Sequence, residues 1–321
     1  MSAVLVSIII VTAGKEGHIH KCLSSIVKQS FRNTETIVID NSLNSALGYF
    51  IAREFPFSRV LKSEKNLFYC AALNKGIAES RGEFVLCLND DVVLDERFVE
   101  EALRGFSVGP GIGMVSGKIL RPDKKTIDSA GLFLSLWRTP LERGYGRIDR
   151  GQFERQGYVF GVNGAVAFYR KEMLNSLLIK GLPGGQEYFD TDLGFFYEDL
   201  DIAWRAQKSG WKGYYIPAAI AYHVRGATAR QSKGINKRFA RFYLNDELNF
   251  NLIRNRYLVI IKNDKLLTFL ACLFFMILFD LVTFAYLIIF RPTVLKFFFN
   301  SAIPFRSALR KRKLIKQLKR I

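Results

Sequence analysis

Cysteine and histidine are scarce in this chain of 321 residues, which holds four cysteines and three histidines. The cysteines lie at positions 22, 70, 87 and 272 and form no CxxC pair, so the sequence supports neither a disulfide scaffold nor a zinc ribbon. We expect them to be buried thiols in a reducing compartment. Charged residues make up only 24% of the chain against 49% hydrophobic residues, which excludes a disordered protein and allows a substantial core.

Several catalytic signatures are also missing. The chain has no GxxxxGK[ST] phosphate loop and no GxGxxG after its first apolar run, which disfavours an NTPase or a dinucleotide enzyme. It lacks a GxSxG elbow and an HExxH helix, which disfavours serine hydrolases and zinc proteases of those types. Internal repeats and low-complexity tracts are absent as well.

Negative charge is scarce at the C-terminal end. From residue 229 onward the chain has 19 Lys and Arg against four acids, so +15 of the net charge of +18 lies there. Residues 1–228 are nearly neutral at +3. This asymmetry predicts a globular domain over 1–228 and a basic region over 229–321 that meets an anionic partner, either nucleic acid or a membrane.

The first 116 residues alternate between short apolar runs and segments with helical spacing. A β-branched run from Val4 to Val11 predicts a buried strand, and further strands are predicted at 36–39, 59–61, 83–88 and 112–116. Helices are predicted at 17–29, 45–55, 71–80 and 95–106. This alternation indicates βαβ units and a mostly parallel α/β sheet, in which ligands bind beyond the carboxyl ends of the strands.

The pattern becomes irregular after this. We interpret residues 118–158, which are rich in Gly and Arg, as long loops of the kind that cover substrate sites. Strand character returns at 160–169, helices are predicted at 171–179 and 198–209, and a last strand is predicted at 211–216, before Pro217.

Residues 266–290 form an apolar run with a single acid, Asp280, and no basic residue. Its 25 residues are long enough to span a bilayer, whereas a soluble core would have to be large to hide them. Lys262 and Lys265 precede the run and ten basic residues follow it, and positive charge on both flanks opposes a single crossing. We expect a re-entrant or in-plane segment with the basic tail on anionic headgroups.

Two acidic pairs are candidates for chemistry. Asp90 and Asp91 follow a predicted strand, and their mutual repulsion would be relieved by a divalent cation carrying a nucleotide diphosphate. A solvated turn or a helix cap explains such a pair equally well. Glu198 and Asp199 follow an aromatic run, so either could be a general base, although acids at a helix start also complement its dipole. His223 becomes a metal-ligand candidate only if the fold brings it to Asp90 and Asp91.

The order of motifs over about the first 228 residues resembles the family-2 glycosyltransferases of the GT-A fold. The first strand ends in Thr12, followed by Ala13-Gly14 where the family typically has Tyr-Asn, and the second ends in Asp40-Asn41-Ser42. Asn66 and the segment Ala71 to Gly76 resemble the helix entry beside the donor, and Leu88-Asn89-Asp90-Asp91-Val92 resembles the DxD-type element. Gly161 to Arg170, Phe195 to Asp201, and His223 after Tyr215-Ile216-Pro217 are similar to later family elements.

The resemblance implies a role for each matched residue. Asp199 is the implied catalytic base, and Asp91 and His223 are the implied ligands of Mg²⁺ or Mn²⁺. The implied donor-binding residues are Thr12, Asp40, Asn66, Asn74, Asp90, Gly164 and Ala165. For the acceptor we expect Glu198 and, because a guanidinium fork matches phosphate, Arg138 and Arg143.

The resemblance implies an inverting enzyme at the cytoplasmic face of the membrane that builds cell-envelope polysaccharide. The QxxRW motif of processive synthases is replaced by Ile202-Ala203-Trp204-Arg205-Ala206, so we expect one sugar to be transferred per encounter. Ile127 to Gly131, Arg143 to Gly146, Arg254-Asn255-Arg256 and Lys262-Asn263 look most like the rhamnosyltransferase-type subgroup, which implies a dTDP-rhamnose donor and a lipid-linked or polysaccharide acceptor.

Two other classes remain open at this stage. The basic tail would suit a nucleic-acid-binding protein, but its charges flank an apolar segment instead of interleaving with stacking aromatics, so we expect no nucleic-acid partner. A noncatalytic relative that only binds sugar nucleotide is the other alternative, and the presence of Asp91, Asp199 and His223 argues against it.

Overall fold

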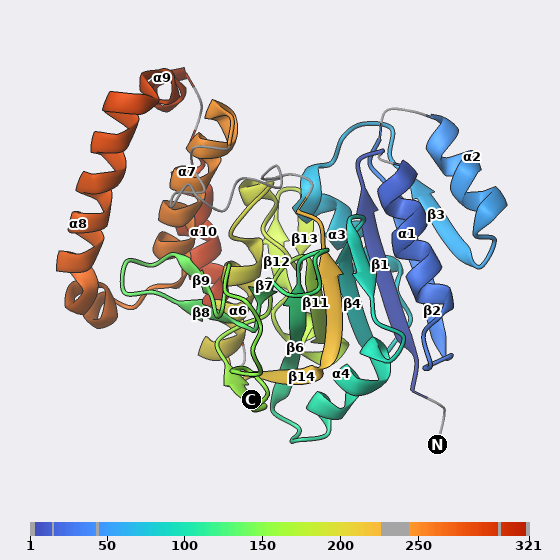
Figure 1. The fold of residues 1–321 in the computed structure, drawn as a ribbon. Coiled ribbons are helices and arrows are strands. Elements are labelled where there is room, and N and C mark those ends of the chain that lie inside the picture. The colour runs from blue at the N-terminus through green and yellow to red at the C-terminus, as the bar shows by residue number, and fades with distance from the viewer. Residues whose placement is uncertain (1–3, 15, 43–44, 226–243, 301–302, 319–321) are drawn as a thin grey trace.

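The computed structural model of the chain describes residues 4–14, 16–42, 45–225, 244–300 and 303–318 (Figure 1). A twisted sheet with helices on both faces forms the larger part, and the helices from residue 246 onward lie to one side of it. The predicted domain boundary between residues 228 and 229 lies outside the described residues.

The main sheet has the strand order β10-β14-β6-β11-β4-β1-β2-β3. Neighbours β4, β1, β2 and β3 are parallel, as are β6 and β14, whereas β11 runs antiparallel between β4 and β6. This confirms the predicted mostly parallel α/β sheet. The bounds are β1 (Val6–Thr12), β2 (Thr34–Asp40), β3 (Ser58–Lys62), β4 (Phe84–Asn89), β6 (Ile112–Leu120), β10 (Gly157–Val159), β11 (Val166–Arg170) and β14 (Lys212–His223).

Two cores form because both faces of the sheet are covered. Along β1, Ile8 and Ile10 point into one core while Ile9 and Val11 point into the other, as the alternation of a strand requires. The first core is closed by α1 (Glu16–Val27), α2 (Ser45–Glu54) and α4 (Phe98–Phe106). The second is closed by α3 (Phe68–Glu79), α5 (Lys171–Ser176) and α6 (Glu198–Lys208). The continuous apolar run of the first strand is thereby explained.

The sequence prediction was wrong about the end of the last strand. β14 continues past Pro217 to His223, and its register with β6 shifts between Ile216 and Ile220. A proline is tolerated in a strand at such an irregularity because no regular ladder hydrogen bond is required of it there. The extension carries His223 to the same end of the sheet as Asp91.

The segment predicted as long loops contains short strands as well. β6 extends to Leu120, and β7 (Ile127–Ser129), β8 (Leu132–Leu134) and β9 (Pro140–Glu142) follow before β10. β7 pairs with β6, and β8 and β9 form a hairpin. Further short elements are β5 (Val92–Leu94), the β12 (Ile179–Leu182) and β13 (Gly185–Glu187) hairpin and the 3-10 helix η1 (Thr191–Leu193).

The C-terminal helices are α7 (Asp246–Asn263), α8 (Leu266–Phe290), α9 (Pro292–Asn300) and α10 (Phe305–Ile315). Helices α7 and α10 pack against each other and reach η1, α6 and β12. Buried ion pairs fasten them there, because Lys262 of α7 and Lys311 of α10 both contact Asp190. Two lysines share one carboxylate in this contact, and Lys262 also lies 2.8 Å from Asp201.

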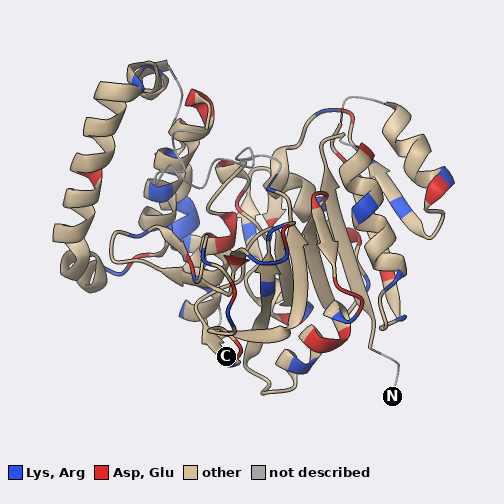
Figure 2. Ribbon diagram, in the orientation of Figure 1, with Lys and Arg blue, Asp and Glu red and all other residues tan. Residues whose placement is uncertain are grey.

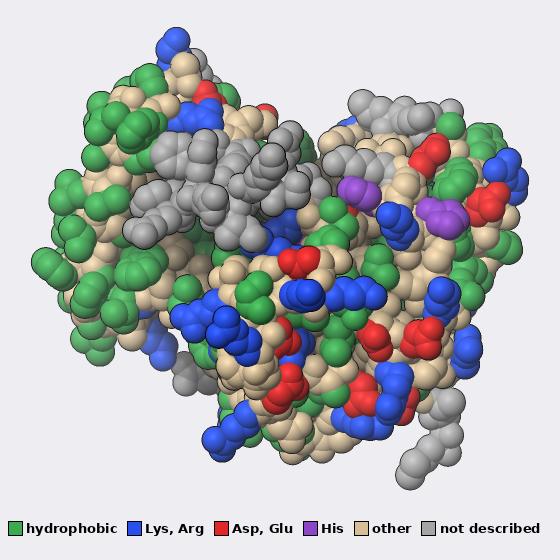
Figure 3. Space-filling model, viewed as in Figure 1, with side chains coloured by type: hydrophobic (Ala, Val, Ile, Leu, Met, Phe, Trp, Pro, Cys, Tyr) green, Lys and Arg blue, Asp and Glu red, His purple; other side chains and the backbone are tan. Residues whose placement is uncertain are grey.

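Helix α8 is the one helix among the described residues that is long and apolar enough to cross a membrane, and 17% of its most apolar window is buried. Leu267, Phe274 and Leu281 are among its exposed side chains. Apolar atoms accordingly cover the side of the molecule that α8 forms (Figure 3), where Figure 2 shows almost no charge along the helix. The single acid in α8, Asp280, lies 2.6 Å from Arg256 of α7.

Candidate active site

The carboxyl ends of β1, β2 and β4 lie side by side. The register places Thr12 opposite Asp40 and Val11 opposite Asn89, so the residues that follow these strands share one edge. The Thr12 hydroxyl donates to Oδ2 of Asp90 over 2.7 Å. Burial raises the pKa of Asp90, and this hydrogen bond opposes the shift. Thr12 and Asp90, two predicted donor-binding residues, are therefore in contact.

Asp40 is fully buried and offers one free oxygen. Its Oδ1 accepts hydrogen bonds from the backbone amide and the hydroxyl of Ser42, at 3.0 and 2.6 Å. Its Oδ2 has no hydrogen-bond partner among the described residues. A buried carboxylate oxygen without a hydrogen bond costs free energy, and a ligand that donates a hydrogen bond to it would remove this cost. An N–H group of a nucleobase could be such a donor.

Two other predicted donor-binding residues, Asn66 and Asn74, hold backbone segments around α3. Asn66 accepts from Asn41 at 2.8 Å and from the amide of Phe68, which fixes the entry of α3 beside the end of β2. Asn74 accepts from the Tyr188 amide and exchanges hydrogen bonds with the Phe189 backbone. These bonds occupy both side-chain groups of Asn74, whereas Asn66 is exposed and takes part in them through its Oδ1 alone.

Asp91 and His223 meet at the edge of the sheet. The Nε2 atom of His223 lies 3.3 Å from Oδ1 of Asp91, and its Nδ1 lies 2.9 Å from Oδ2 of Asp128. Arg225 pairs with the other oxygen of Asp128. Burial lowers the pKa of His223, but the hydrogen bonds to Asp128 and Asp91 outweigh burial and raise it to about 9. Asp128 thus holds the imidazole with Nε2 toward Asp91.

This arrangement suits a divalent cation that brings most of its other ligands with it. The described residues contain no group of three or more His, Cys, Asp or Glu that could hold a metal ion. Asp91 and His223 would supply two ligands, and a cation such as Mg²⁺ is typically bound by one or two carboxylates together with substrate phosphates and water. Because Arg225 already pairs with Asp128, Asp91 is the carboxylate available to the ion, and the ion would displace the proton that Asp91 and Asp128 favour on His223.

Gly164 lies at the junction of the second acidic pair. Its amide donates to Oδ2 of Asp199 at 3.2 Å, and its carbonyl accepts from the Tyr69 hydroxyl at 3.0 Å. A Cβ atom at position 164 would lie 2.9 Å from Oε1 of Glu198, so a larger residue there would displace the end of that side chain. The neighbouring Ala165 donates its amide to Asn163 and accepts from the Asn89 amide, which ties this turn to the end of β4.

The backbone before Glu198 is strained. Phe196 and Tyr197 both have φ of 71°, a left-handed conformation that costs about 1 kcal/mol or more for a residue other than glycine. Burial raises the pKa of Asp199, while the amides of Leu200 and Gly164 lower it by donating to the carboxylate. Burial and the charge of Asp199 raise the pKa of Glu198. Glu198 keeps one buried oxygen without a partner among the described residues.

Glu142 joins the two acidic pairs, and the sequence analysis did not identify it as a candidate. It lies on β9, accepts from Ser129, and accepts from the Asn163 amide group at 2.7 Å. Burial and the charge of Asp199 raise its pKa to about 8. A continuous path therefore runs from Asp91 through His223 and Asp128 to Ser129, Glu142, Asn163, Gly164 and Asp199. Glu142 could not be found from the sequence because it is an isolated acid in a stretch rich in Gly and Arg, where no periodic pattern indicates a strand.

Arg138 and Arg143, predicted to grip acceptor phosphate, both have internal partners. Arg138 is buried, its Nε donates to Asp264 at 2.7 Å, and it also donates to the Thr268 carbonyl of α8. Arg143 donates to the Ala130 carbonyl and lies over the Tyr215 ring at 4.6 Å. Arg138 thus fastens the β8–β9 hairpin to α8, whereas Nη2 of Arg143 is buried without a hydrogen-bond partner among the described residues, and the acceptor role of the two arginines stays a prediction.

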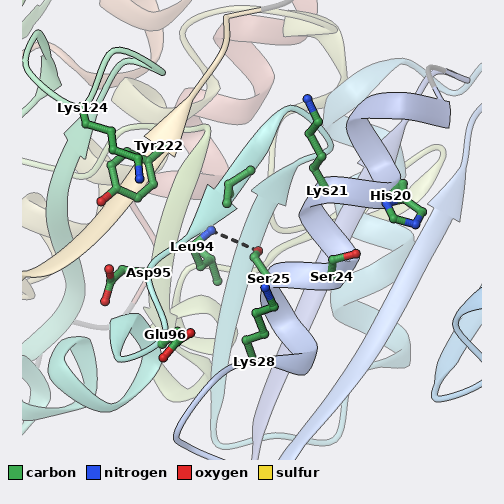
Figure 4. Close-up of a pocket in the computed structure, with 11 residues that line it drawn as sticks. His20, Lys21, Ser24, Ser25, Lys28, Leu94, Asp95, Glu96, Lys124 and Tyr222 are labelled. Atoms are coloured by element: carbon green, nitrogen blue, oxygen red, sulfur yellow. Dashed lines mark hydrogen bonds between the residues drawn. The ribbon is translucent and has the colours of Figure 1, made fainter.

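A cavity of about 470 Å³ lies elsewhere, between α1 and the ends of β5 and β14 (Figure 4). Lysines and acids both line it, and its Ser25 hydroxyl accepts from the Leu94 amide at 3.1 Å. Lys124 lies 5.3 Å from the Tyr222 ring centre there. None of the predicted site residues lines this cavity, so it is separate from the acidic path.

The mostly parallel sheet with its flanking helices has the GT-A fold, and solved structures share this fold. A GalNAc-T7 structure with UDP, GalNAc and Mn²⁺ has a TM-score of 0.58 at 14% identity and covers 81% of this chain and 48% of that one. A mannosyltransferase from Pyrobaculum calidifontis with GDP-Man and Mn²⁺ has a TM-score of 0.54 at 15% identity, over 97% of this chain and 84% of that one.

Residues 7–178 match the model of Glycosyl transferase family 2, and the chain belongs to that family. It is therefore a nucleotide-sugar glycosyltransferase. An N-acetylglucosaminyl-diphospho-decaprenol L-rhamnosyltransferase of Mycobacterium tuberculosis is 25% identical, over 70% of this chain and 77% of the relative. An uncharacterised protein of Sinorhizobium fredii is 29% identical, but the chain spans about a quarter of its length. A poly-beta-1,6-N-acetyl-D-glucosamine synthase of Staphylococcus epidermidis is 24% identical, and less than half of it is covered.

Proposed function

We propose that this enzyme transfers one sugar per encounter, with inversion, from a nucleotide sugar to a lipid-linked or polysaccharide acceptor of the cell envelope. The observation that carries the proposal is the set of contacts that joins Asp91 and His223 to Asp199, in which hydrogen bonds alternate with the chain links Asp128–Ser129 and Asn163–Gly164. One end of this path suits a departing diphosphate with its cation, and the other suits the hydroxyl that attacks.

The donor would lie across the ends of β1, β2 and β4. The free Oδ2 of Asp40 would accept from the nucleobase, while Asp90 and Thr12, already bonded to each other, would border the ribose and the diphosphate. Gly164 and Ala165 would face the sugar, because Gly164, without a side chain, lets the backbone of this turn lie directly against Glu198 and Asp199.

Asp91 and His223 would hold Mg²⁺ or Mn²⁺ together with the donor diphosphate. When bound, the cation neutralises the charge that develops on the departing nucleoside diphosphate. Asp128 keeps Nδ1 of His223 engaged, so that Nε2 faces the position where the ion and the diphosphate meet.

Asp199 would accept the proton of the acceptor hydroxyl as that oxygen attacks the anomeric carbon from the face opposite the diphosphate. Burial raises the basicity of its carboxylate, and the amides of Gly164 and Leu200 fix the direction in which the carboxylate points. Glu198, with one unpartnered oxygen, would accept a hydrogen bond from a second hydroxyl of the acceptor.

The mycobacterial relative supports rhamnose, from dTDP-rhamnose, as the transferred sugar and a diphospho-lipid as the acceptor. It is similar over most of both chains, and its name gives N-acetylglucosaminyl-diphospho-decaprenol as the acceptor of an L-rhamnosyl group. A lipid-carried acceptor also agrees with the exposed apolar surface of α8, which would reach the same membrane.

The C-terminal region would hold the enzyme against the cytoplasmic face of the cell membrane. Arg138 ties the start of α8 to the β8–β9 hairpin, and Arg256 ties its middle to α7. A helix fastened at two points to the folded unit would lie along the bilayer surface with its outer face in lipid. The basic residues on both sides of α8 would contact anionic headgroups.

Transfer can be tested with the full chain, Mn²⁺ and a panel of dTDP-rhamnose, UDP-N-acetylglucosamine and GDP-mannose. The acceptor would be a synthetic prenyl diphosphate N-acetylglucosamine in anionic vesicles. We expect rhamnosyl transfer from dTDP-rhamnose and inversion at the anomeric carbon, read by mass spectrometry and NMR. Transfer from a different donor would overturn the rhamnose assignment. Full activity after the divalent cation has been removed with a chelator would overturn the proposed metal dependence.

A further inference from the structure

Helix α7 lies outside the part of the chain that matches the family model, yet it contacts the segment that leads into Asp199. The side-chain amide of Asn255 is fully buried and lies 2.8 Å from the Leu193 carbonyl, 2.7 Å from that of Phe195 and 3.0 Å from that of Phe196. One NH₂ group thus lies within hydrogen-bonding distance of three backbone carbonyls of the same loop.

The neighbouring residue adds to this contact. Arg254 donates to Oδ1 of Asn255 at 3.0 Å and to the carbonyls of Asp192 and Leu193. The bond to Oδ1 fixes which way the Asn255 amide faces, because it leaves the NH₂ group pointing at the loop. Together the two residues bind the backbone of residues 192–196 from one side.

The loop that they bind is the strained one. Phe196 and Tyr197 hold left-handed φ angles just before α6 begins, and the first turn of α6 contains Glu198 and Asp199. A backbone in this conformation persists only where its surroundings determine it. The carbonyls that Asn255 contacts belong to this loop, whereas the carboxylate of Asp199 is bonded to Gly164 on the other side.

We infer that Asn255, oriented by Arg254, is a positioning residue that sets the backbone in front of Asp199 so that the carboxylate faces the acceptor. The inference rests on the proposed role of Asp199 as the base and adds the C-terminal helix to the active site. Displacement of a catalytic group by about 1 Å can cost roughly 100-fold in rate, so the loss of this contact is expected to lower turnover strongly.

The test compares Asn255→Ala with Asn249→Ala in the full chain. Asn249 is also fully buried in α7, but its amide donates to the carbonyls of Leu244 and Asn245 near the start of its own helix. Both variants remove a buried amide from α7, so a loss of helix stability is common to the two. Arg254→Met is a milder variant for use if Asn255→Ala does not fold.

Hydrogen–deuterium exchange of residues 193–201 is the first readout and does not depend on activity. We expect faster exchange of this segment in Asn255→Ala and in Arg254→Met than in wild type and Asn249→Ala. The second readout is hydrolysis of dTDP-rhamnose with Mn²⁺, in which kcat of Asn255→Ala should fall by about 10- to 100-fold with KM nearly unchanged.

Unchanged exchange, or equal loss of kcat in Asn249→Ala and Asn255→Ala, would overturn the positioning role. Faster exchange with wild-type kcat would overturn it as well. If the wild-type chain processes none of the sugar nucleotides, the proposed function fails, and the exchange of residues 193–201 alone then decides whether Asn255 holds the loop.

Discussion

The backbone amide of Gly164 donates a hydrogen bond to the carboxylate of Asp199 over 3.2 Å, across 35 positions of the chain. Gly164 precedes β11, the strand that runs antiparallel to its neighbours, whereas Asp199 opens α6. The contact thus joins the turn before β11 to α6, the helix that carries the proposed catalytic base. The following predictions examine this site and its supports.

Asp199→Asn should abolish measurable transfer while leaving donor binding intact. The amide has nearly the same shape but cannot accept the acceptor proton, and loss of a general base costs about 100-fold or more. Turnover would be measured with dTDP-rhamnose and Mn²⁺, and binding of dTDP by calorimetry. Transfer at the wild-type rate would exclude Asp199 as the base, and Glu198→Gln serves as the matched variant of the neighbouring acid.

Asp128→Asn should weaken Mn²⁺ binding without removing either proposed ligand. Asp128 holds Nδ1 of His223 at 2.9 Å, and loss of such an orienting carboxylate typically lowers metal affinity about 10- to 100-fold. Titration of the protein with Mn²⁺ and dTDP, followed by electron paramagnetic resonance, would measure the change. The same Mn²⁺ affinity in wild type and variant would show that the Asp128 contact does not orient a ligand.

Glu142 should make the folded state less stable as pH rises. Its folded pKa is raised to about 8 from an ordinary 4.5, so the folded protein binds more protons than the unfolded chain between these values. Stability from this group is therefore present below about pH 4.5 and is lost progressively up to about pH 8. Urea unfolding at pH 5.5 and 8.5 should show a smaller decline for Glu142→Gln than for wild type. A parallel decline in the two proteins would place the ionisation of Glu142 outside this range.

Arg138→Met should destabilise the fold by about 3 kcal/mol, because it leaves the buried carboxylate of Asp264 without its partner. The double variant Arg138→Met, Asp264→Asn removes both charges and should recover part of that loss. Denaturant unfolding of the three proteins measures the difference. If Arg138→Met kept full stability but lost acceptor binding, the predicted role of Arg138 at the acceptor would be supported.

Polar substitutions on the outer face of α8 should release the protein from membranes. Leu267, Phe274, Leu281 and Ile289 are 81%, 72%, 64% and 68% exposed, and burying each in lipid is worth about 2 kcal/mol. The quadruple change to Gln should prevent co-flotation with vesicles of phosphatidylglycerol and phosphatidylcholine. Tyr49→Gln with Tyr158→Gln, at exposed positions of the sheet unit, is the control and should float as wild type does.

Most strands and helices up to residue 116 could be predicted, because β1, β4 and β6 are apolar runs buried on both faces and the helices between them have one apolar side, whereas the short strand β5 was missed. The short strands β7 and β9 could not, because three residues give no period. Asp128 and Glu142 lie on those strands, and the pairings of β7 and β9 bring these acids to the site. Pro217 was taken as the end of a strand, since a sequence does not show that the partner register shifts there.

The sequence identifies the acidic pairs as candidate site residues, but it does not show which side chains lie next to one another. Strand order decides that Asp91 meets His223, and the register of β14 with β5 places His223 opposite Val92. For the two arginines the charge suggested a ligand, and the sequence could not show that the fold places Asp264 beside Arg138 and the Tyr215 ring beside Arg143. The sequence gives Asn255 only as part of a family resemblance, because its contact with residues 193–196 depends on how α7 packs against the sheet domain.

The position of β14 in the sheet has a consequence for the order in which the protein forms during synthesis. β14 is the last strand among the described residues, yet it lies between β6 and β10, and it supplies His223. Domains generally fold as units as they leave the ribosome, so we expect the nascent sheet to stay incomplete until residue 223 has emerged. Protease protection of arrested nascent chains would then rise only at lengths that free β14 from the exit tunnel.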